Sequence, residues 1–139
     1  MVNVDVFYVE FKTKKLPRFG KDPVTAIALG KILCDFYECQ ETMFLKISSF
    51  FENELPGDRW HKQLLENMTI QIKNTRERVI SEKTYLLLQE FLDFRHFYRY
   101  YTGFDYEWKK LEDLEEKYAQ VQPLLKQDIE NFVDFLKKL

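Results

Sequence analysis

The chain contains few residues that break secondary structure. Only four glycines and four prolines are spread over 139 residues, whereas an all-β protein of this length would need many more turn residues. No apolar run approaches the roughly 20 residues needed to cross a bilayer, and no signal-peptide pattern is visible at the N-terminus. We therefore expect long helices in a cytoplasmic protein that has no membrane partner.

Cysteine and histidine are scarce as well. Cys34 and Cys39 are five residues apart, which fits neither a zinc site nor a redox pair, so two buried free thiols are the simpler interpretation. His61 and His96 stand apart from any run of cysteine ligands, and the chain has no glycine-rich phosphate loop and no nucleophile elbow. No metal and no cofactor are expected, and most classes of enzyme lack support.

One segment near the N-terminus has basic residues but no acidic ones. The net charge of −2 excludes a protein that is basic throughout, but the ten residues 12–21 contain no acid. Their basic residues are Lys12, Lys14, Lys15, Arg18 and Lys21. Such a segment can contact a phosphate backbone, although a solvated arm is the more common explanation. Residues 1–21 are predicted to form a basic N-terminal segment or arm, separate from a helical domain at 22–139.

The hydrophobic pattern predicts mostly helices. Val2, Val4, Val6 and Tyr8 alternate with other residues, which indicates a short, non-helical and strand-like start. Asp22 followed by Pro23 is a strong helix start, and helical spacing of apolar residues then continues to about residue 53.

Three further helices follow in the pattern. A short helix is expected at 59–69, and a longer one at 82–101 with Ser81 as its N-cap and Gly103 beyond its end. The apolar stripe from residue 111 to 136 keeps its helical spacing on both sides of Pro123, which predicts a single helix that is kinked near 119–123. The fold class expected from this pattern is an all-α, antiparallel four-helix bundle.

The helix at 82–101 carries the most informative pattern. One of its stripes begins with Leu88 and Leu92 but continues with Arg95 and Arg99. Burying cations costs several kcal/mol unless partners compensate, which is roughly why a core helix avoids them. Arginine binds phosphate oxygens through its forked guanidinium, and a neighbouring His96 could move a proton during attack of a ribose 2′-hydroxyl. Structural arginines at a helix end are at least as common as such sites.

Three stretches of this chain resemble one protein family. They are LGKILCDFYECQETMFLKISSFF at 29–51, LPGDRWHKQLL at 55–65 and LDFRHFYRYYTGFDYEWKKL at 92–111. With their spacing they are similar to the HepT-like branch of the HEPN superfamily, the toxin partners of minimal nucleotidyltransferases. The resemblance implies a helical bundle that forms a homodimer, with metal-independent endoribonuclease activity. It also implies a nucleotidyltransferase antitoxin that modifies a tyrosine beside the catalytic motif.

The catalytic motif of this family is altered here. The family has an arginine, four intervening residues, a histidine, one residue and a tyrosine. Arg95 holds the arginine position, Tyr100 stands at the histidine position, and Thr102 stands at the position of the modified tyrosine. Because tyrosine has a pKa of about 10, it is a poor proton shuttle at neutral pH. His96 is a candidate substitute base, and Arg95 and Arg99 are the candidate RNA-binding or phosphate-binding residues.

Three functions remain open from the sequence. The first is a HEPN-type subunit that binds RNA, a nucleotidyltransferase partner or both, with weak or absent nuclease activity. The second is an active endoribonuclease toxin that uses Arg95, His96, Arg99 and Tyr100. The third is a purely structural interaction protein in which the arginines form interface salt bridges to acids such as Glu90 or Asp93. The replacement at Tyr100 favours the first function over the second.

Overall fold

The fold is all-α, as predicted, in the part of the chain that the structure describes. The computed structural model describes residues 4–52, 58–100 and 107–139, and no strand occurs among them apart from an isolated bridge between Ile72 and Arg76. The helices are α1 (Val4–Glu10), the π-helical turn η1 (Phe11–Lys15), α2 (Leu16–Phe19), α3 (Pro23–Phe51), α4 (Trp60–Asn67), α5 (Glu82–Tyr100) and α6 (Trp108–Lys137).

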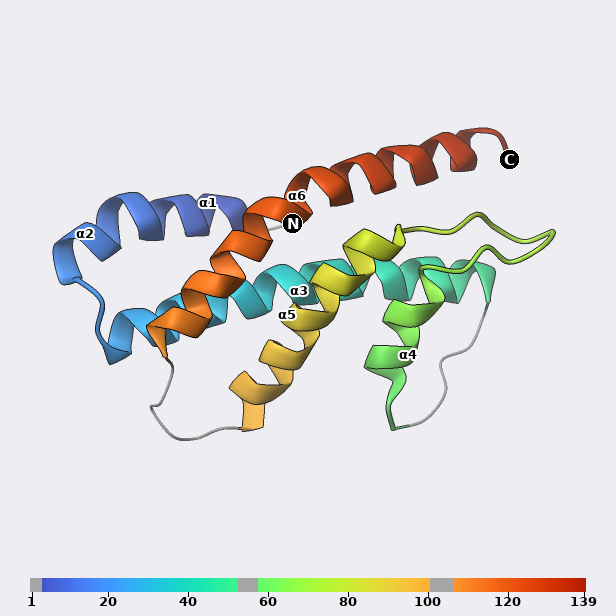
Figure 1. The fold of residues 1–139 in the computed structure, drawn as a ribbon. Helices are drawn as coiled ribbons and strands as arrows, with labels where there is room; N and C mark the ends of the chain where they lie inside the picture. The colour runs from blue at the N-terminus through green and yellow to red at the C-terminus, as the bar shows by residue number, and fades with distance from the viewer. Residues whose placement is uncertain (1–3, 53–57, 101–106) are drawn as a thin grey trace.

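Helix α3 is the central element, in contact with α1, α4, α5 and α6 (Figure 1). It begins where the sequence predicts. The carboxylate of Asp22 accepts a hydrogen bond from the Thr25 backbone N–H, the Thr25 hydroxyl accepts one from the Asp22 N–H, and Pro23 occupies the first turn. This capping box satisfies amide groups that have no partner inside the helix. The long central helix is thus set by local sequence.

Helices α5 and α6 pack antiparallel to each other beside α3 (Figure 1). Ser81 caps α5 as predicted, since its Oγ accepts from the Thr84 N–H. Asp128 of α6 adds a second cap, because its Oδ2 accepts from both the N–H and the hydroxyl of Ser81. Helix α6 continues through Pro123, and Figure 1 shows its axis changing direction part-way along, in line with the predicted kink. The expected end of α5 at Gly103 lies outside the described residues.

The N-terminal prediction is wrong in one respect. Residues 4–19 are helical rather than strand-like. Val4, Tyr8 and Phe11 recur at helical spacing and turn toward the core, where Phe11 is 5% exposed. Val6, which belongs to the alternating pattern that suggested a strand, is exposed. Tertiary packing against α3 therefore decides in favour of the helical period.

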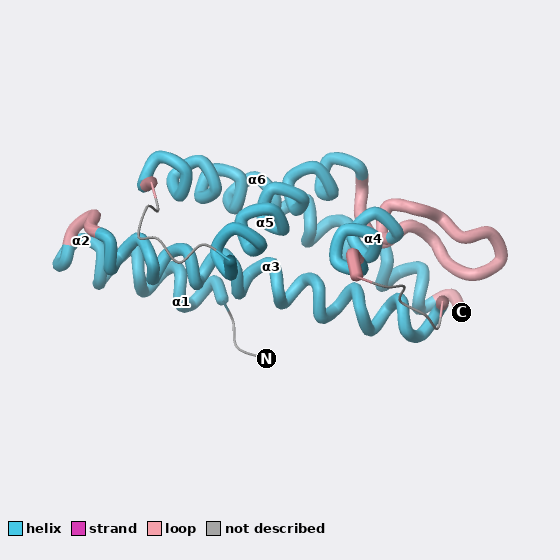
Figure 2. Tube along the Cα trace, turned by 90° about the horizontal axis from the view of Figure 1, so that it is seen from below, coloured by secondary structure: helices cyan, strands magenta, loops and turns pink. Residues whose placement is uncertain are grey.

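A π-helical turn interrupts this N-terminal helix. The N–H of Leu16 donates to the carbonyl of Phe11, five residues back, and the next residue, Pro17, has no N–H to continue an α-helical pattern. The helix ends at Gly20, whose φ of 74° is a conformation that favours glycine. The chain then reverses into α3, so that α1 and α2 run beside α3 in the opposite direction (Figures 1 and 2).

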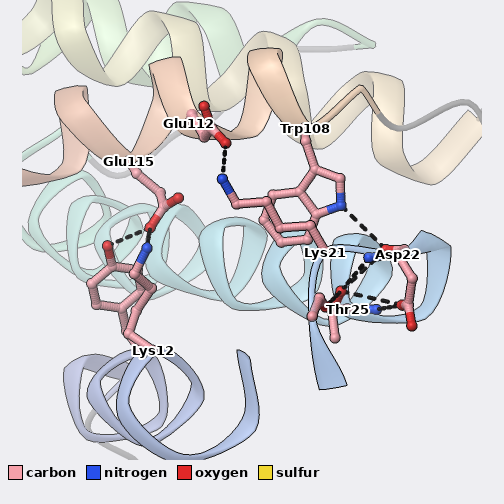
Figure 3. Close-up of polar contacts among 9 residues, drawn as sticks. Lys12, Lys21, Asp22, Thr25, Trp108, Glu112 and Glu115 are labelled. Carbon is pink, nitrogen blue, oxygen red and sulfur yellow. Dashed lines mark hydrogen bonds and ion pairs between the residues drawn. The ribbon is translucent and has the colours of Figure 1, made fainter. Parts of the chain in front are cut away.

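The predicted basic segment is held against the acidic side of α6. Lys12 Nζ lies 2.9 Å from Glu115 Oε2, and Lys21 Nζ lies 2.5 Å from Glu112 Oε1 (Figure 3). Tyr8 also donates a hydrogen bond to Glu115. Part of the segment's positive charge is thus used inside the protein. The division into a segment at 1–21 and a domain at 22–139 stays a prediction.

Trp60 is the first residue of α4, and Trp108 is the first residue of α6. Both rings are partly buried against the core, and Trp108 Nε1 donates to the backbone carbonyl of Asp22, which ties the start of α6 to the start of α3 (Figure 3). None of the described helices is long and apolar enough to cross a membrane.

Candidate anion-binding site at the end of helix α5

Arg95 lies on the last turns of α5, where that helix crosses α3. Its Nε donates a hydrogen bond to Glu38 Oε1 at 2.8 Å. The side chain of Arg95 is only 11% exposed, and that of Glu38 is 43% exposed. Burial lowers the pKa of the Arg95 guanidinium, but the hydrogen bond to Glu38 and the charge of Glu41 together raise it above its ordinary value. Arg95 is therefore a cation at any physiological pH.

A second carboxylate of α3 lies beside the first. Glu41 follows Glu38 by one helical turn, and its side chain is 7% exposed. Its Oε2 lies 2.8 Å from Nδ1 of His61 on α4, and the indole of Trp60 stacks on the His61 ring with centroids 3.6 Å apart. His61 therefore has a hydrogen-bonding partner on α3 and a stacking partner within α4.

These charges border an open cleft between α3 and α5. Its volume is about 520 Å³. Its lining residues are Lys31, Cys34, Glu38, Glu41, Thr42, Arg95, Tyr98 and Arg99. The cleft combines three cations with two acids, and Arg95 and Arg99 stand one helical turn apart on the same wall. It can accept an anionic group at the arginines, while the acids of α3 restrict where that group can sit.

A close approach of the two helices positions this wall. A Cβ atom added to Gly30 of α3 would lie 2.8 Å from Tyr98 Cε2 and 3.5 Å from Phe94 Cζ. Glycine therefore lets the Tyr98 ring rest directly on the α3 backbone. The Tyr98 hydroxyl also donates to the carbonyl of Ile27. These contacts fix the end of α5, and with it Arg95 and Arg99, against α3.

The predicted site residues are only partly brought together. Arg95 and Arg99 line the same cleft, whereas His96 is exposed and is not among the cleft's lining residues. The backbone of Tyr100 ends α5, but its side chain and Thr102 lie outside the described residues. Within the chain, Arg95 pairs with Glu38, and Glu90 pairs with Lys117; the suggested interface salt bridges of the arginines to Glu90 or Asp93 stay a prediction.

The cleft residues also include a thiol. Burial, together with the nearby charges of Glu38 and Asp35, raises the pKa of Cys34 to about 12, so that the thiol is protonated and unreactive at neutral pH. No group of three or more His, Cys, Asp or Glu side chains in the described ranges is arranged to hold a metal ion.

Sequence reasoning missed Glu38 and Glu41 as neighbours of the arginines. Glu38 and Arg95 are 57 positions apart, so no local pattern connects them. A signal was nevertheless present, because Glu41 falls among apolar residues of α3 that are themselves buried. A buried acid in a helix needs a cationic or hydrogen-bonding partner.

Comparison with known proteins gives one result. A family model described as HepT-like protein matches residues 28–136. No curated protein and no solved structure matches the chain.

Proposed function

This chain belongs to the HepT-like family, and from that premise we propose that it is a HEPN-type toxin–antitoxin subunit that binds RNA with weak or absent nuclease activity. Its partners are a nucleotidyltransferase antitoxin and a second copy of itself, and it acts in the cytoplasm. Arg95 and Arg99 contact the RNA phosphates. His96 and Tyr100 are the remaining candidates for proton transfer, and Thr102 stands where the modified tyrosine would be.

The observation that carries this proposal is the way in which the guanidinium of Arg95 is hydrogen-bonded. Glu38 binds Nε, and that bond leaves the two Nη groups, which bear four of the five N–H donors of arginine. A guanidinium held on one edge keeps its position and can still bind a phosphate with the other. Arg99 lies one turn further along the same cleft wall, so that both cations can contact successive phosphates.

The weak or absent nuclease activity follows from the motif rather than from the cleft. Cleavage by a neighbouring 2′-hydroxyl needs a group that accepts and donates protons near pH 7. A tyrosine at position 100 has a reference pKa of about 10 and is a poor substitute for imidazole. His96 is exposed and does not line the cleft, so it is not placed to act beside Arg95 within one subunit.

A homodimer would strengthen the RNA site. One subunit supplies two arginines on one helix, together with acids that reduce the local positive potential. A second copy related by a two-fold axis would bring another Arg95–Arg99 pair and raise the positive potential of the shared cleft. Chemical crosslinking or light scattering of the purified protein tests the dimer independently of RNA.

The test of function is cleavage of total RNA in EDTA by the purified protein, beside the Arg95→Ala and Tyr100→His variants. Filter binding of single-stranded RNA is measured on the same samples. We expect the wild type to bind RNA with little or no cleavage, Arg95→Ala to lose binding by about tenfold, and Tyr100→His to gain cleavage.

The other outcomes identify the alternatives. Cleavage by the wild type that is lost in Arg95→Ala would make the protein an active endoribonuclease. Unchanged RNA binding in Arg95→Ala would show that the arginine is structural, as its pairing with Glu38 also permits. Co-purification with the nucleotidyltransferase partner in the absence of RNA binding would leave a protein-interaction role alone.

A further inference from the structure

Glu41 is a buried carboxylate that lies between the imidazole of His61 and the guanidinium of Arg95. On one side its Oε2 contacts Nδ1 of His61 at 2.8 Å. On the other side its charge acts on Arg95, and both residues line the same cleft. With a side chain only 7% exposed, Glu41 is poorly screened by water. Its charge is therefore felt by both neighbours.

The net charge of these side chains, counted together with Glu38, depends on whether His61 carries a proton. When His61 is protonated, His61 and Arg95 balance Glu38 and Glu41, and the four side chains sum to zero. When His61 is neutral, the two carboxylates outnumber the single guanidinium, and the sum is −1. Lys31 and Arg99 also line the cleft in both cases, so a phosphate that approaches Arg95 meets a more positive cleft when His61 is protonated than when it is neutral.

We propose that Glu41 and His61 form a proton-dependent counter-charge that controls how strongly Arg95 binds the phosphate backbone of single-stranded RNA. This inference rests on the RNA binding proposed above. His61 is a positioning residue, because it acts on the RNA through Glu41 and Arg95 without touching it. RNA affinity falls when the His61–Glu41 pair loses its proton.

The surroundings of His61 suit this role. The Trp60 ring stacks on the imidazole and limits its rotation, so that Nδ1 stays directed at Glu41. Tyr37, also buried beside Glu41, stays neutral because burial and the charge of Glu41 raise its pKa far above its ordinary value. The charged and titratable groups that surround Glu41 are Lys31, Cys34, Tyr37 and Glu38 from α3, and Arg95, Tyr98 and Arg99 from α5.

The experiment is a pH series of RNA affinity. The fluorescence anisotropy of a labelled single-stranded oligoribonucleotide is followed at constant ionic strength between pH 5.5 and 8, the interval in which histidines ordinarily titrate. The wild type is expected to bind about fivefold more tightly at the acid end. His61→Gln should lose this step and bind weakly at both ends, apart from any change contributed by His96.

Glu41→Gln provides the reciprocal test. It removes the carboxylate charge and keeps a hydrogen-bond acceptor for His61, so its affinity at pH 8 should rise about fivefold over the wild type. Glu130→Gln is the matched control, because Glu130 is an exposed acid of α6 and the change in net charge is the same. It should change the affinity at pH 8 by less than twofold.

The outcomes separate this inference from the proposed function. The counter-charge proposal is wrong if the RNA affinity of the wild type and of His61→Gln changes equally with pH. It is also wrong if Glu41→Gln and Glu130→Gln have the same RNA affinity at pH 8. In both cases the proposed RNA binding stands. If no RNA binds at any pH, the proposed function fails and this inference fails with it. Thermal melts of each variant at both pH values show that the compared proteins are folded.

Discussion

Arg95 on α5 and Glu38 on α3 form the only ion pair between these two helices among the described residues, with Nε 2.8 Å from Oε1. The pair has two effects that oppose each other. It holds the arginine in one position, and it satisfies part of the guanidinium's demand for an anion. Binding of an RNA phosphate must therefore compete with, or be added to, a contact that already exists within the subunit.

Replacing Glu38 by Gln should tighten RNA binding. The change removes the competing negative charge and retains an acceptor for Arg95 Nε, so we expect affinity to rise about three- to tenfold. Because Glu38 is 43% exposed, the loss of the ion pair should lower the free energy of unfolding by only about 0.5 kcal/mol. Anisotropy titration with single-stranded RNA and urea unfolding measure the two quantities.

Gly30→Ala should disturb the site without touching it. The new Cβ would lie 2.8 Å from Tyr98 Cε2, and overpacking of this kind costs about 1–3 kcal/mol, offset by up to about 1 kcal/mol of helix propensity. We expect lower stability in urea unfolding and weaker RNA binding. The double variant Gly30→Ala/Tyr98→Ala should be less destabilised than the sum of the single variants; strict additivity would contradict the packing argument.

The N-terminal helix should contribute strongly to stability through one side chain. Phe11 is 5% exposed and belongs to the main core, whereas Phe7 of the same helical stretch is 51% exposed. Phe11→Ala should lower the free energy of unfolding by about 3 kcal/mol, and Phe7→Ala, the matched control, by less than about 0.5 kcal/mol. Equal effects of the two substitutions in urea unfolding would mean that the N-terminal segment is not docked as described.

The protein should lose stability in alkali. Burial raises the pKa of Tyr37, and burial together with contacts to Asp5 and Glu115 raises those of Tyr118 and Tyr8. In the unfolded chain these phenols ionise near pH 10, but in the folded protein they do so only at higher pH. The unfolded state therefore releases protons first, and the free energy of unfolding is full below pH 10 and falls above it.

Substitution of single tyrosines by phenylalanine tests which side chain causes this loss of stability in alkali. Tyr37→Phe should flatten the fall in stability between pH 10 and 11.5 in urea unfolding, since Tyr37 is fully buried. Tyr85→Phe, at a half-buried tyrosine of α5 whose pKa is also raised, should flatten it less. An unchanged slope in Tyr37→Phe would contradict the prediction.

Much of the fold was predictable because its signals are local. The helix starts at Pro23 and Glu82 depend on the side chains of Asp22 and Ser81, each of which caps amides three residues ahead. The distribution of buried residues on α5 also followed the predicted period, with Leu88 and Phe91 buried and Arg99 exposed.

The N-terminal segment shows the limit of such signals. Its residues satisfy a period of two and a helical period at once, and only packing of Phe11 against the core, with Tyr8 bonded to Glu115, selects the helix. Sequence periodicity cannot decide between two patterns when the choice depends on a surface formed by other elements, here α3 and Glu115 of α6.

The sequence by itself determined that the chain is helical, that it resembles the HepT-like family and that Arg95 and Arg99 share one face of a helix, because all three depend on local spacing and motif. The tertiary structure alone decided which charges surround Arg95. Glu38 and Glu41 come from α3, and His61, which is bonded to Glu41, comes from α4; they are brought together with Arg95 only because α3 packs against both α4 and α5. Electrostatic interactions depend on distance in space rather than along the chain, and the charge balance of the site is therefore a property of the folded protein.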